Sequence, residues 1–383
     1  MKKFRKIAAL IWVFIMIQSC SDDVDSSENE TSIGSLSNAL ANPEAWNWVD
    51  NENIISRDGS SGGYAINFSD QSDKLLIYLP GGRACFDAFS CGGNEPNYSE
   101  EKFFAKADGT RALFNRSVRA DNANNLFKDW HQVFVAYSSG DVYSGDNEGV
   151  DVGNGGDPDQ TFKGFTNFSI MLNEVVTFLV ENQITISEVF LAGSSAGGYG
   201  VLANFQQLER IISDNFPNVQ FTMLNDAGYL LLDENVVPFC LNSEWDNLFN
   251  IQVPGDLNDF VNTPEEFRFL SIYEYLSNKY PNANFGFYGS YSDLISRTLL
   301  SLGQDNCAYE VGLINADIFK AGLLNQYNRI LQDLSNWRVY YAETESHTAL
   351  PFDEYQTLEV KGKKFADWVN DLHAGTAEDV IDD

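Results

Sequence analysis

Histidine, methionine and basic side chains are scarce in this chain. Its 383 residues include three histidines, four methionines and 24 Lys and Arg against 55 Asp and Glu, which gives a formal net charge of −31. Such an acidic surface repels phosphate backbones, which argues against a nucleic-acid-binding protein. The sequence also has no CxxC motif and no two neighbouring histidines, so we expect no metal site of the zinc type.

Long hydrophobic runs are absent. The apolar stretch IAALIWVFIMI at residues 7–17 has eleven residues, fewer than a membrane-spanning helix needs. The basic segment MKKFRK precedes it, so we interpret residues 1–19 as a signal peptide. Ile17-Gln18-Ser19-Cys20 resembles a bacterial lipobox, which predicts a lipid on Cys20. An ordinary secretory signal cleaved near this point is the alternative.

The segment that follows Cys20 is polar and acidic (SDDVDSSENETS). Residues 20–44 are therefore predicted to form a lipidated, flexible tether. We expect an exported outer-membrane lipoprotein, on the cell surface or in the periplasm, or a secreted protein if the lipid is missing. We expect contact with the membrane only through the N-terminal lipid anchor.

Cysteine is rare but paired in number. Of five cysteines, Cys20 has its own explanation, which leaves four. An even number in an oxidising compartment predicts two disulfides. Cys85 and Cys91 lie close together in a Gly-rich segment and form the favoured local pair, which leaves Cys240 with Cys307. Four buried free thiols are the alternative.

Hydrophobic residues, at 44% of the chain, are sufficient for a sizeable core. Short apolar runs that end in Gly- or Asp-bearing loops alternate with helical patterns, which predicts a doubly wound α/β fold. We expect one domain over residues 45–383 with a mostly parallel sheet and helices on both faces. The predicted strands are residues 74–82, 131–141, 188–198, 219–228, 285–293 and 337–347, and the predicted helices include 167–183, 201–216, 293–303 and 316–336.

Two segments interrupt this alternation. Residues 229–284 contain no clear strand, and we interpret them as a helical insertion over the ligand site or as a longer crossover. The acidic, Gly-rich residues 145–160 offer oxygen ligands for calcium but lack the spacing of an EF-hand. A solvated loop at the rim of the site is the favoured interpretation.

The stretch VFLAGSSAGGYG at residues 189–200 carries the strongest chemical signal. Ser195 has Gly193 two residues before it and Gly197 two residues after it, whereas Ser194 is flanked by alanines in this register. A strand-like run precedes the motif and a helical pattern follows. This is the context of the G-x-S-x-G nucleophile elbow, so Ser195 is the candidate nucleophile. A simple Gly/Ser turn is the alternative.

A serine hydroxyl needs a general base within hydrogen-bond reach. His131 begins a strand, at the sheet edge opposite the predicted site, and His373 lies on an amphipathic C-terminal helix, where we expect a solvated face. His347 follows the last predicted strand, where the order Ser, acid, His places the base. His347 is therefore the candidate base.

The acid that orients this imidazole has two candidates. Asp293 ends the strand run just before the one that precedes His347, and it is favoured. Asp226, at the end of the preceding run, is the alternative acid. An oxyanion hole needs backbone N–H donors: Ala196, directly after the nucleophile, is one, and the glycines of YLPGGRACFD are a source of others.

Several blocks occur together in the order seen in one family of serine carboxylesterases. GGRACFDAFSC, YSSGDVYSGD, GSSAGGYG, NDAGYL and the loops of Asp293 and His347 resemble the pectin acetylesterase/Notum family over about residues 45–370. The resemblance implies an α/β-hydrolase-like fold with no metal or organic cofactor. It also implies a Ser195, Asp293 and His347 triad, with oxyanion donors from Gly82, Arg83 and Ala196.

Two departures from the family pattern concern the substrate and the disulfides. Arg83 stands where relatives carry an aromatic residue, so it either favours an anionic substrate such as a uronate polymer or pairs with Asp87. YSSGD at residues 137–141 replaces a cysteine-bearing block, which predicts that one family disulfide is missing.

The sequence as a whole predicts an exported serine carboxylesterase. Its partner would be an acylated polysaccharide such as pectin, or another ester substrate, from which it removes acetyl or similar acyl groups. One alternative is a Notum-like deacylase or an esterase of lipids or polyesters. A catalytically inactive, glycan-binding surface lipoprotein on the same scaffold is the other.

Overall fold

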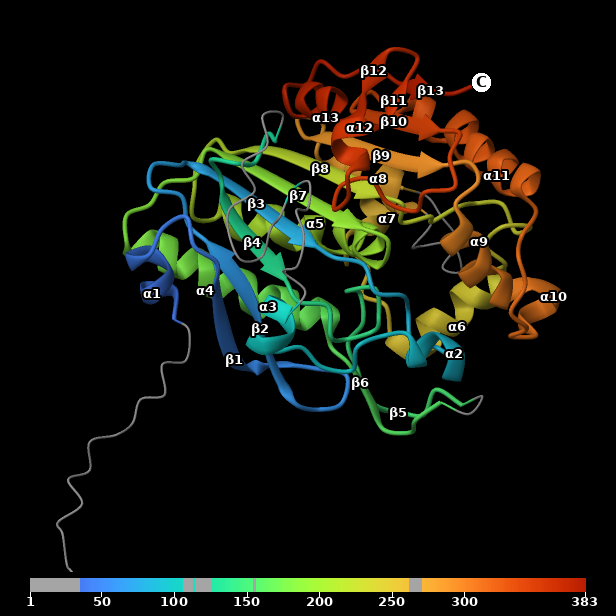
Figure 1. Ribbon diagram of the computed structural model, residues 1–383, viewed down its shortest axis with the longest axis horizontal. Coiled ribbons are helices and arrows are strands. Elements are labelled where there is room, and N and C mark those ends of the chain that lie inside the picture. Colours follow the sequence, from blue (N-terminus) through green and yellow to red (C-terminus); the bar gives the residue numbers. More distant parts are fainter. Residues whose placement is uncertain (1–34, 106–112, 114–124, 154–155, 262–270) are drawn as a thin grey trace, which may run out of the picture. The chain divides into compact units, whose positions relative to one another are not determined.

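A nine-stranded sheet organises the folded unit, which spans Gly34–Asp383 (Figure 1). The computed structural model describes residues 35–105, 113, 125–153, 156–261 and 271–383. Its strand order is β1-β2-β4-β3-β7-β8-β9-β10-β13. β2 runs antiparallel to both of its neighbours, and every other neighbouring pair is parallel. The predicted doubly wound, mostly parallel fold is therefore confirmed.

The strands of the main sheet are β1 (Asn47–Ile55), β2 (Ser61–Asn67), β3 (Lys74–Leu79), β4 (His131–Val135), β7 (Glu188–Ser194), β8 (Gln220–Asp226), β9 (Asn284–Ser290), β10 (Trp337–Ala342) and β13 (Val380–Ile381). Two small hairpins pair β5 (Asn147–Val150) with β6 (Gln160–Phe162) and β11 (Glu359–Val360) with β12 (Lys363–Lys364). All six predicted runs are strands, and they are adjacent in the sheet.

The α-helices of the described residues are α1 (Leu36–Ala41), α2 (Ala88–Gly92), α3 (Glu100–Ala105), α4 (Gly164–Glu181), α5 (Ala196–Ser213), α6 (Phe239–Phe249), α7 (Leu257–Phe260), α8 (Ile272–Lys279), α9 (Leu294–Leu300), α10 (Gln304–Cys307), α11 (Ala316–Arg329), α12 (Glu354–Thr357) and α13 (Phe365–His373). Two 3₁₀ turns, Ser301–Gly303 and Leu331–Asp333, complete them. The helices predicted from periodicity correspond to α4, α5, α9 and α11.

Side chains of β9 show that helices cover both faces of the sheet. Successive strand residues point to opposite faces. Phe285 contacts Phe205 of α5, whereas Tyr288 contacts Phe365 of α13. α5 also packs on β3, β7 and β8, and α4 packs beside it. The predicted arrangement with helices on both faces is therefore present.

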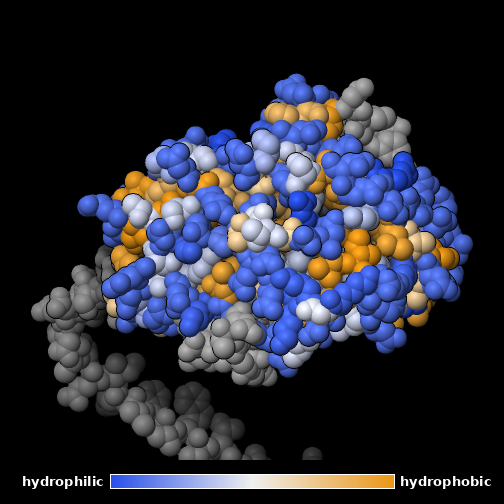
Figure 2. All heavy atoms as spheres, turned by 90° about the horizontal axis from the view of Figure 1, so that it is seen from above, coloured by the Kyte–Doolittle hydropathy of each residue, from blue (hydrophilic) through white to orange (hydrophobic). Residues whose placement is uncertain are grey.

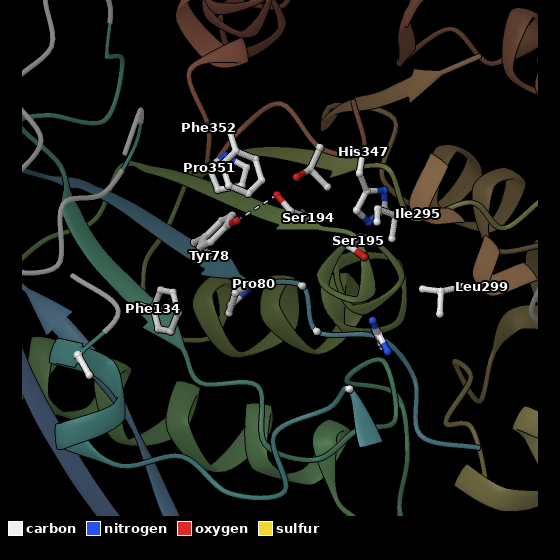
Figure 3. Close-up of a pocket in the computed structure, with 16 residues that line it drawn as sticks. Tyr78, Pro80, Phe134, Ser194, Ser195, Ile295, Leu299, His347, Pro351 and Phe352 are labelled. Carbon is white, nitrogen blue, oxygen red and sulfur yellow. Dashed lines mark hydrogen bonds between the residues drawn. The ribbon is translucent and has the colours of Figure 1, made fainter. Parts of the chain in front are cut away.

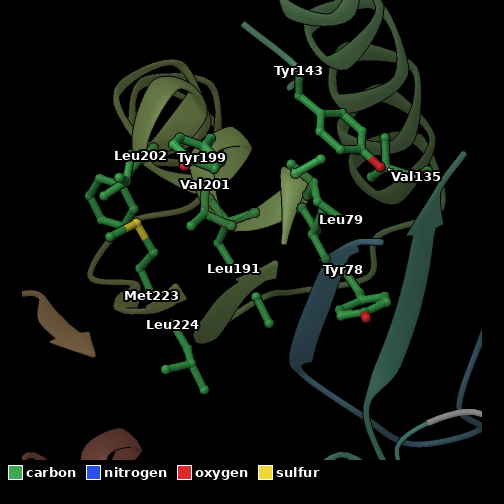
Figure 4. Packing of buried hydrophobic residues seen from close by; sticks show 14 of the residues in the cluster. Tyr78, Leu79, Val135, Tyr143, Leu191, Tyr199, Val201, Leu202, Met223 and Leu224 are labelled. Atoms are coloured by element: carbon green, nitrogen blue, oxygen red, sulfur yellow. Dashed lines mark hydrogen bonds between the residues drawn. The ribbon is translucent and has the colours of Figure 1, made fainter. Parts of the chain in front are cut away.

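The core surrounds β7, the strand that leads to Ser195. Figure 4 shows Leu191 of this strand packed among Leu79, Val201 and Met223, which come from β3, α5 and β8. Each of these side chains is fully buried, and burying such a side chain stabilises the fold by about 1.5–3 kcal/mol. The turn after β7 is thus anchored by apolar packing on both sides of the strand.

The strand order creates a crevice at the site. From β3 the chain continues to β4 on one side, whereas β7 lies on the other side of β3. The loops that leave β3 and β7 therefore diverge, and ligands bind at such a switch point in doubly wound sheets. The Gly81–Gly82 loop and Ser195 follow these two strands.

Both predicted disulfides are present, and they lie near this crevice. Cys85 is bonded to Cys91, and Cys240 to Cys307. The first closes the loop after β3, and the second joins α6 to α10. The predicted insertion is helical in its described part, which holds α6, α7 and α8; residues 262–270 lie outside the described residues.

The N-terminal boundary lies earlier than predicted. Leu36 and Ala39 of α1 are buried, and α1 packs on β1 and β2. Residues 36–44 therefore belong to the folded unit and not to a flexible tether. The predicted signal peptide, Cys20 and the rest of the tether up to residue 34 lie outside the described residues.

Within the described residues, no helix has the length and apolarity that a membrane crossing requires. Figure 2 shows mostly hydrophilic residues on one face, interrupted by smaller apolar areas.

Candidate active site

Ser195 sits on a sharp turn between β7 and α5. Its backbone has φ 57° and ψ −117°, a conformation that residues with a side chain rarely adopt. Glycines allow the close packing of this turn. A Cβ at Gly193 would lie 2.0 Å from the carbonyl oxygen of Gly197, and a Cβ at Gly197 would lie 1.9 Å from that of Leu79. The local geometry is that of a nucleophile elbow.

His347 and Asp293 meet beside this turn. His347 Nδ1 lies 2.7 Å from Asp293 Oδ2, and the Asp293 side chain is fully buried. The other carboxylate oxygen accepts a 2.8 Å hydrogen bond from the backbone N–H of Ser296 at the start of α9. Because a carboxylate only accepts, the imidazole proton resides on Nδ1.

The opposite ring nitrogen is free to act. His347 Nε2 is buried and has no hydrogen-bond partner among the described residues. Figure 3 places the labelled Ser195 and His347 side by side in the cavity. A neutral imidazole in this tautomer presents the Nε2 lone pair, which is the state required of a general base.

Asp226, the alternative acid, has different partners. Its Oδ2 accepts hydrogen bonds from Ser194 Oγ (2.6 Å) and from Leu350 N (3.0 Å), and its Oδ1 accepts one from Ala349 N (3.0 Å). Complete burial raises the pKa of this carboxyl to about 6, although these hydrogen bonds oppose the shift. Asp293 is therefore the carboxylate that contacts His347, while Asp226 holds the backbone just after it.

The loop after β3 approaches Ser195 closely. A Cβ at Gly81 would lie 2.8 Å from Ser195 Cβ, so glycine permits this approach. Carbonyl oxygens of the loop are held on its other side: Asn94 Nδ2 donates to Gly82 (2.7 Å), and the Tyr137 hydroxyl donates to Arg83 (2.7 Å). Ala196 is the first residue of α5, so its N–H has no partner within the helix.

Residues 137–143 support the loop after β3. This supporting role was not predicted from the sequence. Tyr143 donates from its hydroxyl to Pro80 O (2.9 Å), and its ring stacks on Tyr137 with centroids 4.5 Å apart. Buried Asp141 accepts from Ser139 Oγ, Tyr143 N and Gly164 N. Burial raises the pKa of Asp141 to about 6. The block YSSGDVYSGD thus supports the loop after β3. In the sequence, the two tyrosines are the only signal that could have suggested this role.

Two cavities of unequal size meet at Ser195. The larger, of about 500 Å³, is also lined by Tyr78, Gly82, His347, Pro351 and Phe352. The smaller, of about 40 Å³, is lined by Phe86, Ala196, Tyr199, Trp245 and Leu300. Arg83 lines both. In Figure 3, Pro351, Phe352 and Tyr78 lie on one side of the wide cavity, and Ile295 and Leu299 lie on the other.

Arg83 is the charged side chain in this site. Although the chain has 55 acidic residues, no described Asp or Glu lines either cavity. The predicted pairing with Asp87 is wrong, because Asp87 caps α2 through Ser90 N at 2.8 Å. Within the described ranges Arg83 forms no ion pair, and its guanidinium lies 5.4 Å from the Phe89 ring centroid.

The other two histidines lie away from the site. His131 begins β4 at the opposite sheet edge, where it bonds Ser69 N and Ser72 O. His373 was expected on a solvated face, and this is wrong: its side chain is 12% exposed and Nε2 lies 2.6 Å from Glu188. Burial lowers its pKa, partly offset by Glu188. The apolar face of α13 packs on the sheet, and His373 is buried because it lies at the end of this helix.

The acidic stretch 145–160 forms most of the β5–β6 hairpin, and its charges are partly neutralised. Lys163 pairs with Asp146 (2.9 Å) and Glu148 (2.6 Å). None of its described residues lines either cavity, so this hairpin is not part of the cavity walls. Across the described residues, no group of three or more His, Cys, Asp and Glu is arranged to hold a metal ion.

The sheet, the serine on its strained turn and the acid and histidine on later loops define an α/β-hydrolase fold. The crystal structure of the Wnt deacylase Notum from Drosophila matches with a TM-score of 0.63 at 17% identity, over 88% of this chain and 95% of that chain. At this identity the match shows a shared fold.

A family model of pectinacetylesterases matches residues 37–259, more than half of the sequence. This chain belongs to the pectinacetylesterase family. Among similar proteins are palmitoleoyl-protein carboxylesterases: notum1a of Danio rerio is 28% identical over 186 residues (48% of this chain, 35% of that protein), and notum2 of Xenopus laevis is 30% identical over 190 residues (48% and 36%). The matched region thus spans about a third of the length of these relatives.

Proposed function

We propose that this protein is an exported serine carboxylesterase that removes acetyl or similarly small acyl groups from a polysaccharide such as pectin. The observation that carries the proposal is the convergence of Ser195, His347 and Asp293 at one crevice, with His347 Nε2 buried and unpaired among the described residues. Membership of the pectinacetylesterase family supports the reaction class.

The geometry supports a two-step reaction. Ser195 Oγ attacks the ester carbonyl carbon while His347 Nε2 takes the hydroxyl proton, and the negative charge develops on the carbonyl oxygen. The C–O bond to the alcohol then breaks, and His347 returns the proton to the leaving oxygen. Water, deprotonated by His347, then attacks the acyl-enzyme. The bond between Ser195 Oγ and the acyl carbon breaks, His347 returns the proton to Ser195 Oγ, and the acid is released. Asp293 holds the imidazole in this orientation and stabilises the imidazolium.

The backbone N–H groups of Gly82, Arg83 and Ala196 are the proposed oxyanion donors. Gly82 and Arg83 line the wide cavity with Ser195, and their carbonyl oxygens are held by Asn94 and Tyr137. Fixed donors of this kind need no reorganisation during the reaction, and each is worth about 10²–10³-fold in rate.

An acylated, anionic polysaccharide fits the wide cavity best. It is large and open enough for sugar rings, and its exposed Phe352 offers an apolar face for them. Arg83, which forms no ion pair within the described residues, is suited to a carboxylate on the substrate. An esterase of long-chain lipids is less well supported, because the second cavity holds only about 40 Å³. Export is supported by the two disulfides.

Hydrolysis of p-nitrophenyl acetate and release of acetate from acetylated pectin test this proposal. We expect the Ser195→Ala protein to lose about 10⁴-fold or more of kcat/KM on both substrates, with an unchanged circular dichroism spectrum. A fluorophosphonate probe should label the wild type and not this variant. Retained hydrolysis in the variant would exclude Ser195 as the nucleophile. Glycan binding without hydrolysis or labelling would instead support the inactive, glycan-binding alternative.

A further inference from the structure

We propose that Trp245, on the inserted helix α6, restricts the acyl group to short chains by narrowing the small cavity beside Ser195. This inference rests on the proposed esterase function and assigns a role to a residue of the 229–284 insertion. The starting observation is the contrast between cavities of about 40 Å³ and about 500 Å³ that meet at the same serine.

The chemistry of the reaction decides which part of the ester enters which cavity. The base must reach the leaving alcohol oxygen in order to protonate it. His347 lines the wide cavity and does not line the narrow one. The alcohol therefore occupies the wide cavity. The acyl group extends the other way, into the narrow cavity beyond Ala196.

Aromatic and aliphatic side chains close this acyl cavity. Trp245 contacts Phe86 and Tyr199, with ring centroids 5.7 and 5.6 Å apart, respectively. Leu300 of α9 completes the wall. Trp245 is largely buried, and its indole Nε1 is likewise buried. No acidic side chain of the described residues lines this space.

Disulfides hold two of these walls in place. Cys240 lies in the first turn of α6, five residues before Trp245, and is bonded to Cys307 of α10. Phe86 directly follows Cys85, which is bonded to Cys91. Neither wall can swing aside without strain on a cross-link, so the cavity has little freedom to widen around a longer chain.

The size of the cavity then sets the acyl length. In the same measure the narrow cavity has about 40 Å³ and the wide one about 500 Å³, so the narrow cavity suits a short acyl chain. An octanoyl chain is six methylenes longer than an acetyl group. It would have to displace Trp245 or leave its methylenes in water.

The test compares kcat/KM for p-nitrophenyl acetate, butyrate, hexanoate and octanoate. We expect the wild type to prefer acetate over octanoate by about 10- to 100-fold, because a chain that does not fit must displace buried side chains. In the Trp245→Ala protein the octanoate-to-acetate ratio should rise by about tenfold or more. Leu300→Ala, on a different helix, should shift the ratio in the same direction.

A matched aromatic substitution on the alcohol side is the control. Phe352→Ala should leave the octanoate-to-acetate ratio unchanged, because Phe352 lines only the wide cavity. If Trp245→Ala fails to fold, Leu300→Ala and the milder Trp245→Phe decide the question. A wild type that cleaves octanoate as well as acetate, or unchanged ratios in folded variants, would overturn the acyl-length role alone. No hydrolysis of any ester by the wild type would instead refute the proposed function.

Discussion

Two buried carboxylates, Asp293 and Asp226, serve the loop that carries His347 in different ways. Asp293 contacts the imidazole directly, whereas Asp226 accepts the N–H groups of Ala349 and Leu350 and the hydroxyl of Ser194. Tyr78 donates in turn to Ser194 Oγ at 3.0 Å. Asp226 therefore links the serine turn to the histidine loop and is a positioning residue.

Substitution of each carboxylate by its amide should separate these roles. We expect Asp293→Asn to lower kcat by about 10⁴-fold, because the amide favours the wrong imidazole tautomer. Asp226→Asn removes buried acceptors, at a cost of about 1–3 kcal/mol, so kcat should fall only about 10–100-fold and the melting temperature should drop. Equal losses of kcat in the two variants would contradict the assignment.

Asp226 also predicts a pH dependence of stability. Its pKa is raised in the folded protein to about 6, from 3.8. A carboxyl whose pKa is raised by folding stabilises the folded protein fully at pH values below its pKa in the unfolded chain. This stabilisation is lost as the pH rises through the pKa of the folded protein. Between pH 4 and 6, the wild type should therefore lose stability relative to Asp226→Asn, as denaturant unfolding at each pH would measure.

Residue-scale predictions from the sequence rest on spacing and on elimination. Register alone separates Ser195 from Ser194, and elimination among three histidines leaves His347, which lines the same cavity as Ser195. Asp226 and Asp293 could not be separated in this way, because Asp226 ends β8 and Asp293 follows β9 closely at the same sheet edge. Their partners depend on the path of the 344–350 loop, which is set by packing.

Among the elements, the two cross-linked segments make different demands on the fold. The Cys85–Cys91 bond spans six residues within the loop that borders Ser195, whereas Cys240–Cys307 spans 67 residues and ties α6 to α10. Loop-closure entropy predicts about 2 kcal/mol for the short link and about 4 kcal/mol for the long one.

Paired Cys→Ser substitutions should therefore affect stability and activity differently. Cys240→Ser with Cys307→Ser should lower the free energy of unfolding more, while Cys85→Ser with Cys91→Ser should lower kcat on p-nitrophenyl acetate more, because that loop holds the proposed oxyanion donors. Denaturant titration and steady-state kinetics on both double variants test this. The reverse order in either measurement would contradict it.

Element prediction missed β1, β2 and β13, the strands toward the two ends of the sheet order. The six runs found from the sequence are buried on both faces and therefore read as continuous apolar segments. β1 instead carries Asp50, Asn51 and Glu52 and is half exposed. β13 has two residues, too few for any pattern. Their pairing is determined by long-range contacts that local composition does not encode.

At the scale of the whole molecule, the negative net charge repels an anionic substrate, whereas the lining of the site does not. The chain carries −31, yet the described lining of both cavities contains Arg83 and no acidic residue. An acetylated polyuronate is therefore repelled at long range and attracted at short range. The net charge and six of the strands could be predicted from the sequence. This separation could not, because it depends on which loops meet.

Ionic strength should reveal that separation. The Debye length falls from about 30 Å at 0.01 M to about 8 Å at 0.15 M, so added salt screens the long-range repulsion first. We expect kcat/KM on acetylated pectin to rise severalfold across this range, while that on neutral p-nitrophenyl acetate stays nearly constant. Arg83→Gln should lower the pectin value more than the acetate value. A steady fall with salt on pectin would contradict this picture.

The strained backbone at Ser195 has a consequence for how this sequence can evolve. Glycine adopts φ 57° without the steric cost that serine bears, about 1 kcal/mol or more. A glycine at position 195 would therefore give a more stable protein that has no nucleophile. Selection for turnover must keep opposing selection for stability at this one position. In a lineage released from the need to hydrolyse esters, position 195 is where we expect the first drift, towards glycine or asparagine.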